Sequence, residues 1–251
     1  MKIHSHLTDK NSILKLEELL KDFDQEGTLF AGGDRNTIKT FLFEGRQITI
    51  KSFKIPNLVN KIAYKFFRKS KAQRSYEYAS KLLEMQVGTP KPIAYAENQQ
   101  FLFNRSFYAC DLVACDLTYR DLVENSAYVE NTEILRAFTQ FTYSLHEKGI
   151  HFLDHSPGNT LIKINKDGYE FYLVDLNRME FKPMDYNTRI GNFSRLTPKK
   201  SMVEVMATEY AHLADYDVQK TIDDMWRATE EFQNGFKRKK RLKKKLKFWK
   251  N

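Results

Sequence analysis

Apolar side chains recur at helical spacing near the start of the chain and again through its second half. In residues 11–22 they fall on one helical face, at Ile13, Leu16, Leu19 and Leu20. In residues 131–148 they follow the capping candidates Asn131 and Thr132 and stop at Gly149. The pattern therefore predicts a first short helix and a strong core helix at 131–148, with further helices at about 198–213 and 215–233.

Between these helices the chain carries short β-branched and aromatic runs that predict strands. Three runs, TLFAGG, TIKTFLF and RQITIKSF, are split by the turn residues Gly32-Gly33-Asp34 and Glu44-Gly45. Residues 92–113 predict two or three more strands, after a helical stretch from 57 to 86 that breaks near 69–71. A second hairpin, TLIKI to YEFYLVDL, follows the loop HFLDHSPGN. The prediction is an α+β protein with a strand-rich half and then a helix-rich half.

Composition supports a globular protein of one large domain or two lobes. The 251 residues are 41 % hydrophobic, 14 % aromatic and 29 % charged, which excludes disordered, collagenous and coiled-coil classes. We expect a strand-rich N-terminal part at 1–113, a helix-rich part at 114–236 and a basic tail at 237–251. Two cysteines, Cys110 and Cys115, cannot form a disulfide framework, and no apolar run suits a secretory signal or a membrane span. A cytoplasmic location is the expectation.

The net charge of +9 is concentrated in two segments. Residues 237–251 hold ten basic residues and no acidic one, and residues 45–76 hold nine basic residues and no acidic one. The remaining chain is 22 basic against 32 acidic. Basic patches on an acidic body indicate an anionic surface as partner, either phospholipid head groups or nucleic acid.

Apolar residues interleave with the charge in both basic segments. In the tail Leu242, Leu246 and Trp249 share one helical face, which suits a helix lying in a membrane interface. A solvated tail with incidental affinity for RNA is the alternative. Residues 57–70 place Leu58, Ile62 and Phe66 on one face, and this face either meets lipid or packs on the strand-rich half. We expect no specific nucleic-acid partner.

Three polar residues of the second half have the spacing of a phosphoryl-transfer site of the protein-kinase kind. Asp154 and Asn159 lie five residues apart in the loop after the core helix, and Asp175 ends the hairpin that follows. An Asp in the first position orients the acceptor hydroxyl and takes its proton. Asn159 and Asp175 offer oxygen ligands to Mg²⁺.

Lys51 supplies a further part of this constellation. It lies in the predicted strand ITIKSF about twenty residues after the Gly32-Gly33 turn, where a lysine that contacts the α- and β-phosphates of ATP is expected. Glu77 lies on the helix that would present its ion-pair partner. The loop has no GxGxxG motif, so backbone donors around Gly32, Gly33 and Asn36 would cover the phosphates.

These residues carry a resemblance to a known family. Residues 25–235 resemble the lipopolysaccharide kinases, through AGGDRNTIKTF, ITIKSFK, SKAQRSYEYASKLLEMQVGTPKPIAY, GIHFLDHSPGNTLI and YLVDLNRMEF. The resemblance implies a two-lobed protein-kinase-like fold, with an antiparallel sheet lobe carrying helix αC, a helix-rich catalytic lobe, and ATP between them. It also implies ATP- and Mg²⁺-dependent phosphorylation of a Kdo or heptose hydroxyl on Kdo–lipid A, at the cytoplasmic face of the inner membrane.

Two alternatives to this function stay open. The loop DHSPGN is also similar to that of aminoglycoside and choline phosphotransferases, so a soluble small-molecule phosphotransferase is the first alternative. A nucleic-acid or membrane-binding module on an inactive kinase scaffold is the second. No long activation segment follows Asp175, which argues against a protein substrate. Basic residues after it are candidates for binding an acidic sugar or a lipid phosphate: Arg178, Lys182, Arg189 and Arg195.

Overall fold

The computed structural model describes residues 1–32, 36–57, 61, 64, 67–99, 103–125 and 132–248, with the side chains of Gln99 and of 243–248 excluded. The chain divides into two compact units. The first comprises Met1–Ala114 and Val174–Asn177, and the second comprises Cys115–Leu173 and Arg178–Asn251. A short stretch, Val174–Asn177, thus returns to the first unit from between two segments of the second.

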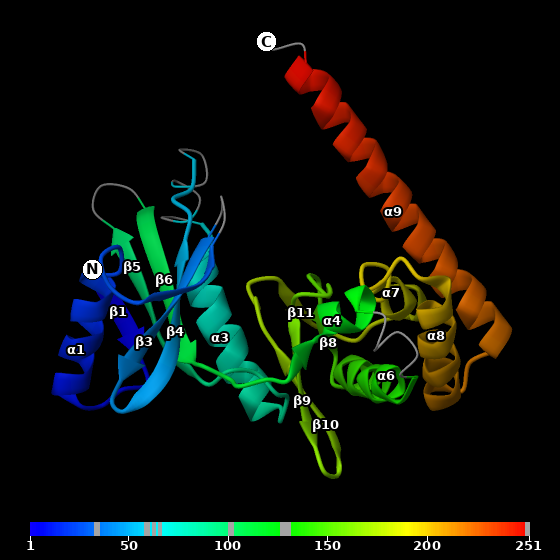
Figure 1. Cartoon of the computed structure of the whole chain (residues 1–251), viewed down its shortest axis with the longest axis horizontal. Helices are drawn as coiled ribbons and strands as arrows, with labels where there is room; N and C mark the ends of the chain where they lie inside the picture. Colours follow the sequence, from blue (N-terminus) through cyan, green and yellow to red (C-terminus); the bar gives the residue numbers. More distant parts are fainter. Residues whose placement is uncertain are drawn as a thin grey trace. The chain divides into compact units, whose positions relative to one another are not determined.

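The first unit is built on a six-stranded antiparallel sheet with the strand order β1-β5-β6-β4-β3-β2 (Figure 1). The antiparallel sheet predicted for the N-terminal half is confirmed. Its strands are β1 (Lys2–Ser5), β2 (Thr28–Gly32), β3 (Asn36–Phe43), β4 (Arg46–Phe53), β5 (Pro92–Gln99) and β6 (Phe103–Asp111).

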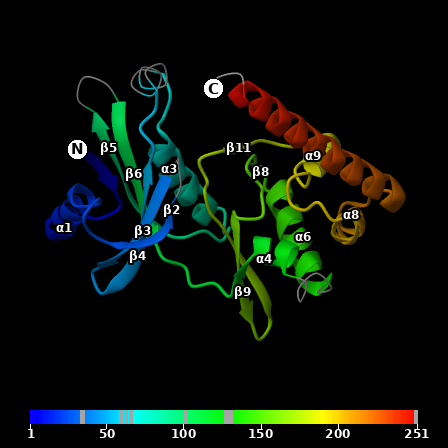
Figure 2. The same ribbon diagram turned by 45° about the horizontal axis from the view of Figure 1, so that its top comes forward.

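In the described part of the unit, two helices with full bounds accompany this sheet (Figure 2). Helix α1 (Lys10–Lys21) buries Leu16 and Leu20 against residues such as Ile48 and Ile50 in one apolar cluster. Helix α3 (Lys71–Glu84) begins at Ser70, whose side chain accepts from the backbone N–H of Gln73, and contacts β5 and β6. Because side chains alternate along a strand, the residues between those of the α1 cluster point to the opposite face.

The second unit packs its helices around one apolar cluster. They are α4 (Tyr119–Glu124), α6 (Thr132–Glu147), α7 (Tyr186–Gly191), α8 (Lys200–Ala214) and α9 (Val218–Phe248). Helix α6 contributes Ile134, Leu135 and Phe138 to the cluster, and α8 contributes Met206 and Tyr210. The predicted core helix is therefore confirmed.

Short strands frame the loops of this unit. Strands β9 (Thr160–Asn165) and β10 (Gly168–Leu173) form the predicted hairpin, and β7 (Leu117–Thr118) pairs with β9. Strand β8 (Ile150–Phe152) pairs with β11 (Met179–Phe181). The segment 153–159 between β8 and β9 is the loop in which Asp154 and Asn159 were predicted.

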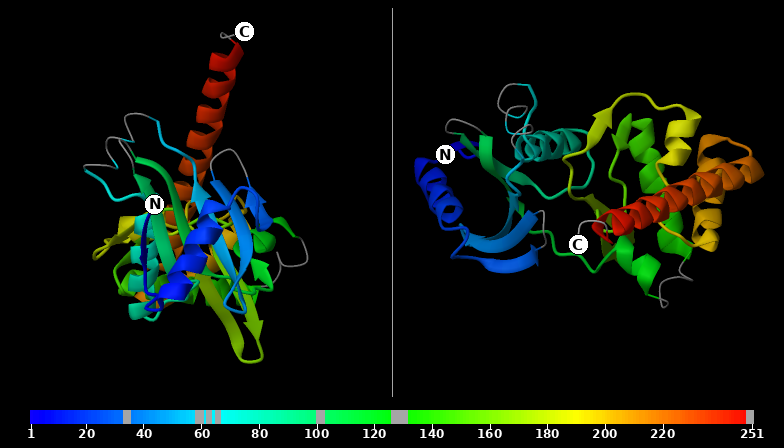
Figure 3. Two further views of the ribbon diagram at one scale, coloured as in Figure 1. Left: turned by 90° about the vertical axis from the view of Figure 1, so that its left-hand side faces the viewer. Right: turned by 90° about the horizontal axis from the view of Figure 1, so that it is seen from above.

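Helix α9 continues far beyond the predicted end at 233. It runs unbroken from Val218 to Phe248, so the basic residues from 237 onward extend a helix rather than follow one (Figure 3). Lys and Arg are good helix formers, which lets the helix continue where apolar periodicity weakens. Over the described residues, no helix combines the length and the apolar composition needed to cross a membrane.

Some predictions concern positions of which the structure describes nothing or only the backbone. They are Gly33 and Asp34 in the first turn, Leu58, Ile62 and Phe66 in the segment 57–70, Asn131 before α6, and Leu246 and Trp249 in the tail.

Two glycines adopt the left-handed conformation at turns with different surroundings. Gly45 has a φ of 75° in the two-residue turn between β3 and β4, and a Cβ added there meets nothing within 4 Å. Gly149 has a φ of 68° between α6 and β8, and an added Cβ would lie 3.2 Å from the carbonyl oxygen of Lys182. Gly149 thus lets β11 approach the start of β8.

We expect Gly149→Ala to destabilise the protein more than Gly45→Ala. Both variants force an L side chain into the left-handed region, at a cost of about 1 kcal/mol, and Gly149→Ala adds the close contact, for a total of about 2 kcal/mol or more. Urea unfolding followed by far-ultraviolet circular dichroism measures both. Equal losses in the two variants would show that the approach to Lys182 does not constrain Gly149.

Candidate functional site

In the first unit the site is built from Lys51 and Asp175. Lys51 lies on β4, where its cross-strand neighbours are Ile38 on β3 and Tyr108 on β6. Its Nζ donates to Oδ1 of Asp175 at 2.7 Å, and only 13 % of the lysine side chain is exposed. The ammonium also lies 5.3 Å from the ring centroid of Phe53. A mostly buried ammonium is thereby paired with a carboxylate.

The backbone of Asp175 is strained and its carboxylate is held on one side. Asp175 has a φ of 59°, in the left-handed region that non-glycine residues rarely adopt. Nδ2 of Asn177 donates to the same Oδ1 at 2.5 Å. The other oxygen, Oδ2, takes part in no hydrogen bond with the described residues. A carboxylate oriented in this way retains one oxygen for a further ligand.

Glu77 does not pair with Lys51, which corrects the predicted ion pair. Its Oε2 accepts from Lys69 at 2.8 Å and its Oε1 accepts from Gln73 at 2.9 Å. The negative charge of Glu77 also acts on a neighbouring tyrosine, Tyr95. Burial of Tyr95, together with the carboxylates of Glu97 and Glu77, raises the pKa of its hydroxyl to about 12. The lysine that precedes α3 supplies the counter-charge of Glu77, while Asp175 supplies that of Lys51.

The predicted phosphate-covering turn is described only at its two ends. Gly32 ends β2 and Asn36 begins β3, and Gly33 lies outside the described residues. Oδ1 of Asn36 is buried and has no hydrogen-bond partner in the described part of the chain. An unsatisfied buried acceptor at this position requires an explanation, and a bound donor would satisfy it.

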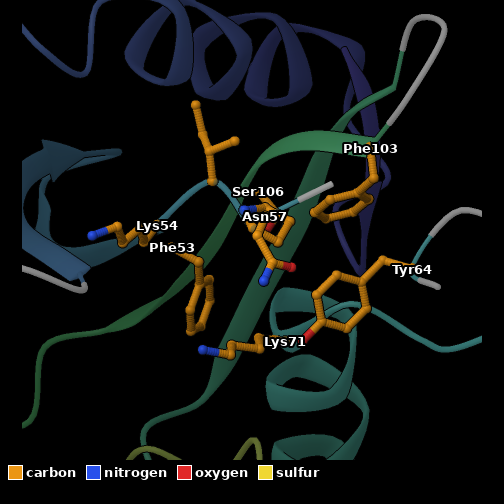
Figure 4. Close-up of a pocket in the computed structure, with 9 residues that line it drawn as sticks. Phe53, Lys54, Asn57, Tyr64, Lys71, Phe103 and Ser106 are labelled. Atoms are coloured by element: carbon orange, nitrogen blue, oxygen red, sulfur yellow. The ribbon is translucent and has the colours of Figure 1, made fainter. Parts of the chain in front are cut away.

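A separate cavity of about 340 Å³ lies at the end of β4 in the same unit (Figure 4). Its walls are Phe53, Lys54, Ile55, Pro56, Asn57, Tyr64, Lys71, Phe103 and Ser106. Phe53 touches both this cavity and the surroundings of Lys51, but none of the predicted site residues lines it. The cavity is therefore distinct from the predicted ATP-contacting residues.

In the second unit the loop 153–159 fixes Asp154 and Asn159 relative to each other. Nδ2 of Asn159 donates to the backbone oxygen of Asp154 at 2.8 Å, and the backbone N–H of Asn159 donates to the carbonyl of Ser156 at 2.9 Å. Because only the amide nitrogen can donate to a carbonyl, the side-chain oxygen of Asn159 is left for another ligand. The spacing of five residues thus closes a compact loop.

Two arginines face the carboxylate of Asp154. Nη1 of Arg195 lies 2.9 Å from Oδ1, and Nη1 of Arg178 lies 3.9 Å from Oδ2. The Asp154 side chain is 19 % exposed. From the sequence both arginines are candidates for binding an anion, and nothing in it links either of them to Asp154. The other two candidates pair elsewhere, Lys182 with Glu180 and Arg189 with Glu147.

Asn177 was not predicted as a site residue. Its position two residues after Asp175 is the only signal in the sequence, since Asn and Asp side chains often bond polar groups two residues away. Its side chain is buried, and its amide holds the Asp175 carboxylate. Its role is therefore to orient Asp175.

No group of three or more His, Cys, Asp or Glu side chains suited to a metal occurs among the described residues. Mg²⁺ in phosphoryl transfer is held by one or two protein side chains together with substrate phosphates. The oxygens of Asp175 and Asn159 are of the type that Mg²⁺ prefers. Taken separately, the side chain of Asp175 in the first unit and that of Asn159 in the second therefore each fit the role of a magnesium ligand.

Two histidines behind the loop are buried and neutral. His155 follows Asp154 and packs against the rings of Phe138 and Phe152, with centroid distances of 5.4 and 5.8 Å. Burial lowers the pKa of His155 to about 3 and that of His146 to about 4. His155 is thus placed as part of the core, not as an acid or base beside Asp154.

These lowered pKa values predict a loss of stability on mild acidification. Between pH 6.5 and 4 the unfolded chain binds protons at both histidines and the folded chain does not, so the free energy of unfolding falls as the pH falls. At pH 5 the loss is about 2 kcal/mol for each histidine. Melting temperatures at pH 7 and pH 5 measure it, and His155→Leu should reduce the difference.

His212→Leu, on the exposed side of α8, is the matched control for this measurement. It should leave the difference between the two melting temperatures unchanged. A His155→Leu variant that is as sensitive to acid as the wild type would contradict the burial of a neutral imidazole.

Comparison with known proteins identifies the family. Residues 51–228 match the Lipopolysaccharide kinase (Kdo/WaaP) family. No curated protein sequence matches the chain. A solved structure, "WaaP in complex with acyl carrier protein", has a similar fold, with a TM-score of 0.61 at 13 % identity over 92 % of this chain and 99 % of that one. The family match covers Lys51, Asp154, Asn159 and Asp175. The chain therefore belongs to the lipopolysaccharide kinase (Kdo/WaaP) family.

Proposed function

We propose that the protein transfers the γ-phosphoryl group of ATP to a sugar hydroxyl, of Kdo or heptose, in the lipopolysaccharide inner core on lipid A. The observation that carries the proposal is the paired carboxylate of Asp175, which lies within the family match. Lys51 and Asn177 hold one of its oxygens and leave the other for a metal. In this proposal the first unit covers ATP, α3 corresponds to helix αC of protein kinases, and the second unit is catalytic.

Asp154 acts on the acceptor in the proposed reaction. Its carboxylate accepts a hydrogen bond from the acceptor hydroxyl, which orients the oxygen, and takes the proton as the oxygen bonds to phosphorus. The bond between the γ-phosphorus and the bridging oxygen breaks, and ADP leaves. The carboxylate is suited to this role because it is 19 % exposed and lies in a loop closed by Asn159.

Lys51, Asp175 and Asn159 act on the nucleotide. Lys51 contacts the α- and β-phosphates, and the Oδ2 oxygen of Asp175 and the side-chain oxygen of Asn159 are the proposed Mg²⁺ ligands. Mg²⁺, when bound, neutralises the charge that develops on the phosphate oxygens. Glu77 stays a candidate for the nucleotide-binding part, and it would reach Lys51 only by leaving Lys69. Gly32, Gly33 and Asn36 are the candidates for covering the phosphates.

The basic end of α9 suits an enzyme whose acceptor is a lipid. Residues 237–248 continue a helix and carry nine of the ten tail cations, and each cation near an anionic leaflet contributes about 1 kcal/mol. Exposed apolar residues accompany them, with Phe236 at 61 % and Leu242 at 52 %. We propose adhesion to anionic lipids at the cytoplasmic face of the inner membrane, with the segment 57–70 as a further contact.

Transfer of labelled γ-phosphate to purified Kdo–lipid A in detergent micelles tests the proposed reaction. We expect label in the lipid with the wild type, and a loss of at least about 10³-fold with Asp154→Ala and with Asp175→Ala. Circular dichroism controls for folding of both variants. Full activity in either variant would contradict the assigned roles. Activity of the wild type on free sugars or alcohols only would instead favour a soluble phosphotransferase.

Removal of residues 237–251 tests the role proposed for the end of α9. The truncated protein should lose binding to vesicles that contain anionic phospholipid, because the ten cations are lost, and its KM for Kdo–lipid A in such vesicles should rise about 10-fold or more. A short soluble acceptor should be phosphorylated at the wild-type rate. Vesicle co-sedimentation at low and high salt measures binding, and unchanged binding would exclude the tail as the membrane contact.

A further inference from the structure

Arg195 lies in a tight turn whose backbone is fixed by its neighbours. The turn follows α7 and is closed by two backbone hydrogen bonds. The N–H of Ser194 donates to the carbonyl oxygen of Gly191 at 3.1 Å, and the N–H of Leu196 donates to that of Phe193 at 3.0 Å. Phe193 and Leu196, on either side of Arg195, are fully buried in the apolar cluster of the second unit. The guanidinium therefore extends from a fixed point.

The guanidinium of Arg195 contacts two parts of the loop 153–159, which carries Asp154. Nη1 donates to the backbone oxygen of Leu153 at 3.1 Å and lies 2.9 Å from Oδ1 of Asp154. One group thus holds the main chain just before the aspartate as well as its carboxylate. A planar guanidinium with several donors is suited to such a double contact, whereas the single ammonium of lysine is less so.

Helix α9 holds the guanidinium from another side. The ring of Phe232 lies 5.4 Å from the guanidinium carbon of Arg195, a distance at which the ring attracts a cation. This part of α9 is anchored, because Thr221, Met225 and Thr229 are all fully buried. Three elements, the turn after α7, the loop 153–159 and α9, therefore meet at Arg195.

We propose that Arg195 is a positioning residue for the carboxylate of Asp154, and that Phe232 of α9 keeps Arg195 in place. This inference rests on the role proposed for Asp154. It differs from the expectation that Arg195 binds an acidic sugar, since a guanidinium engaged by a carboxylate, a carbonyl and a ring would have to give up these contacts to bind substrate. Arg178 is more available for that purpose, since its side chain is 55 % exposed and its nitrogen lies 3.9 Å from Asp154.

The central test compares Arg195→Met with Arg136→Met. Arg136 pairs with Glu209 at the same distance of 2.9 Å and does not contact Asp154, so its variant controls for the loss of an arginine–carboxylate pair. We expect Arg195→Met to lower kcat about 100-fold, with KM for ATP changed less than twofold, because Lys51 and Asp175 are unaltered. Arg136→Met should retain wild-type kcat.

Graded variants separate positioning from a merely structural role. Arg195→Lys should recover part of kcat, Phe232→Leu should lower kcat roughly threefold, and added guanidinium ion should restore part of the activity of Arg195→Ala. In an Asp154→Ala background, Arg195→Met should cause no further loss of kcat. Wild-type kcat in Arg195→Met, or a loss that is equal in both arginine variants, would overturn the inference.

Thermal unfolding tests the contact without turnover. The melting temperatures of Arg195→Met, Asp154→Asn and the double variant form a cycle, and we expect the double variant to lose less than the sum of the single losses. Strictly additive losses would overturn the inference. If the wild type transfers no phosphate to any acceptor, the proposed function fails, and this cycle still decides whether Arg195 holds Asp154.

Discussion

Lys51 carries an ammonium in the middle of a sheet strand, with 13 % of its side chain exposed, and a charge so placed needs a partner to remain in the fold. The partner is Asp175, which lies 124 residues further along the chain. This ion pair joins residues 174–177 to the sheet of the first unit, although β10 and β11, on either side of them, belong to the second. The proposed nucleotide-binding chemistry of the first unit depends on it.

The conformation of Asp175 is costly and is maintained by its contacts. A left-handed φ costs about 1–2 kcal/mol for a residue with a side chain, and such strain persists where surrounding contacts over-determine it. At Asp175 these contacts are two hydrogen bonds to Oδ1, one donated by the ammonium of Lys51 and one by the side-chain amide of Asn177. The two donors both bind Oδ1 and leave Oδ2 as the oxygen that the proposed function assigns to Mg²⁺. The strained backbone and the proposed metal ligand therefore depend on the same two contacts.

Local patterns predicted the elements, and long-range pairing decided the details of the site. Alternating strands, the hairpin at β9 and β10 and the apolar face of α6 follow from two- and 3.6-residue periodicity. The partner of Lys51 does not, because Glu77 and Asp175 are both carboxylates and only the fold selects between them. Arg195 was similarly ambiguous, since a lone arginine in a loop does not indicate which carboxylate it meets. The sequence predicted a helix to 233 and a helical face in the basic tail, but not that the two form one continuous helix, because Gly235 lies between them.

The two ends of α9 are subject to different forces. The first part is held by burial of Met225 and by packing on α8, whereas the residues from 237 onward carry nine cations up to Phe248 and no acid to offset them. Cations are favourable near a helix C-terminus, but like charges three and four residues apart repel each other. An anionic surface would neutralise this repulsion and leave the favourable interaction of the cations with the helix dipole. Binding of α9 to such a surface would therefore stabilise the helix itself. Since Phe232 lies on the anchored part of the same helix and touches Arg195, α9 connects its basic end to the residue that contacts the loop 153–159.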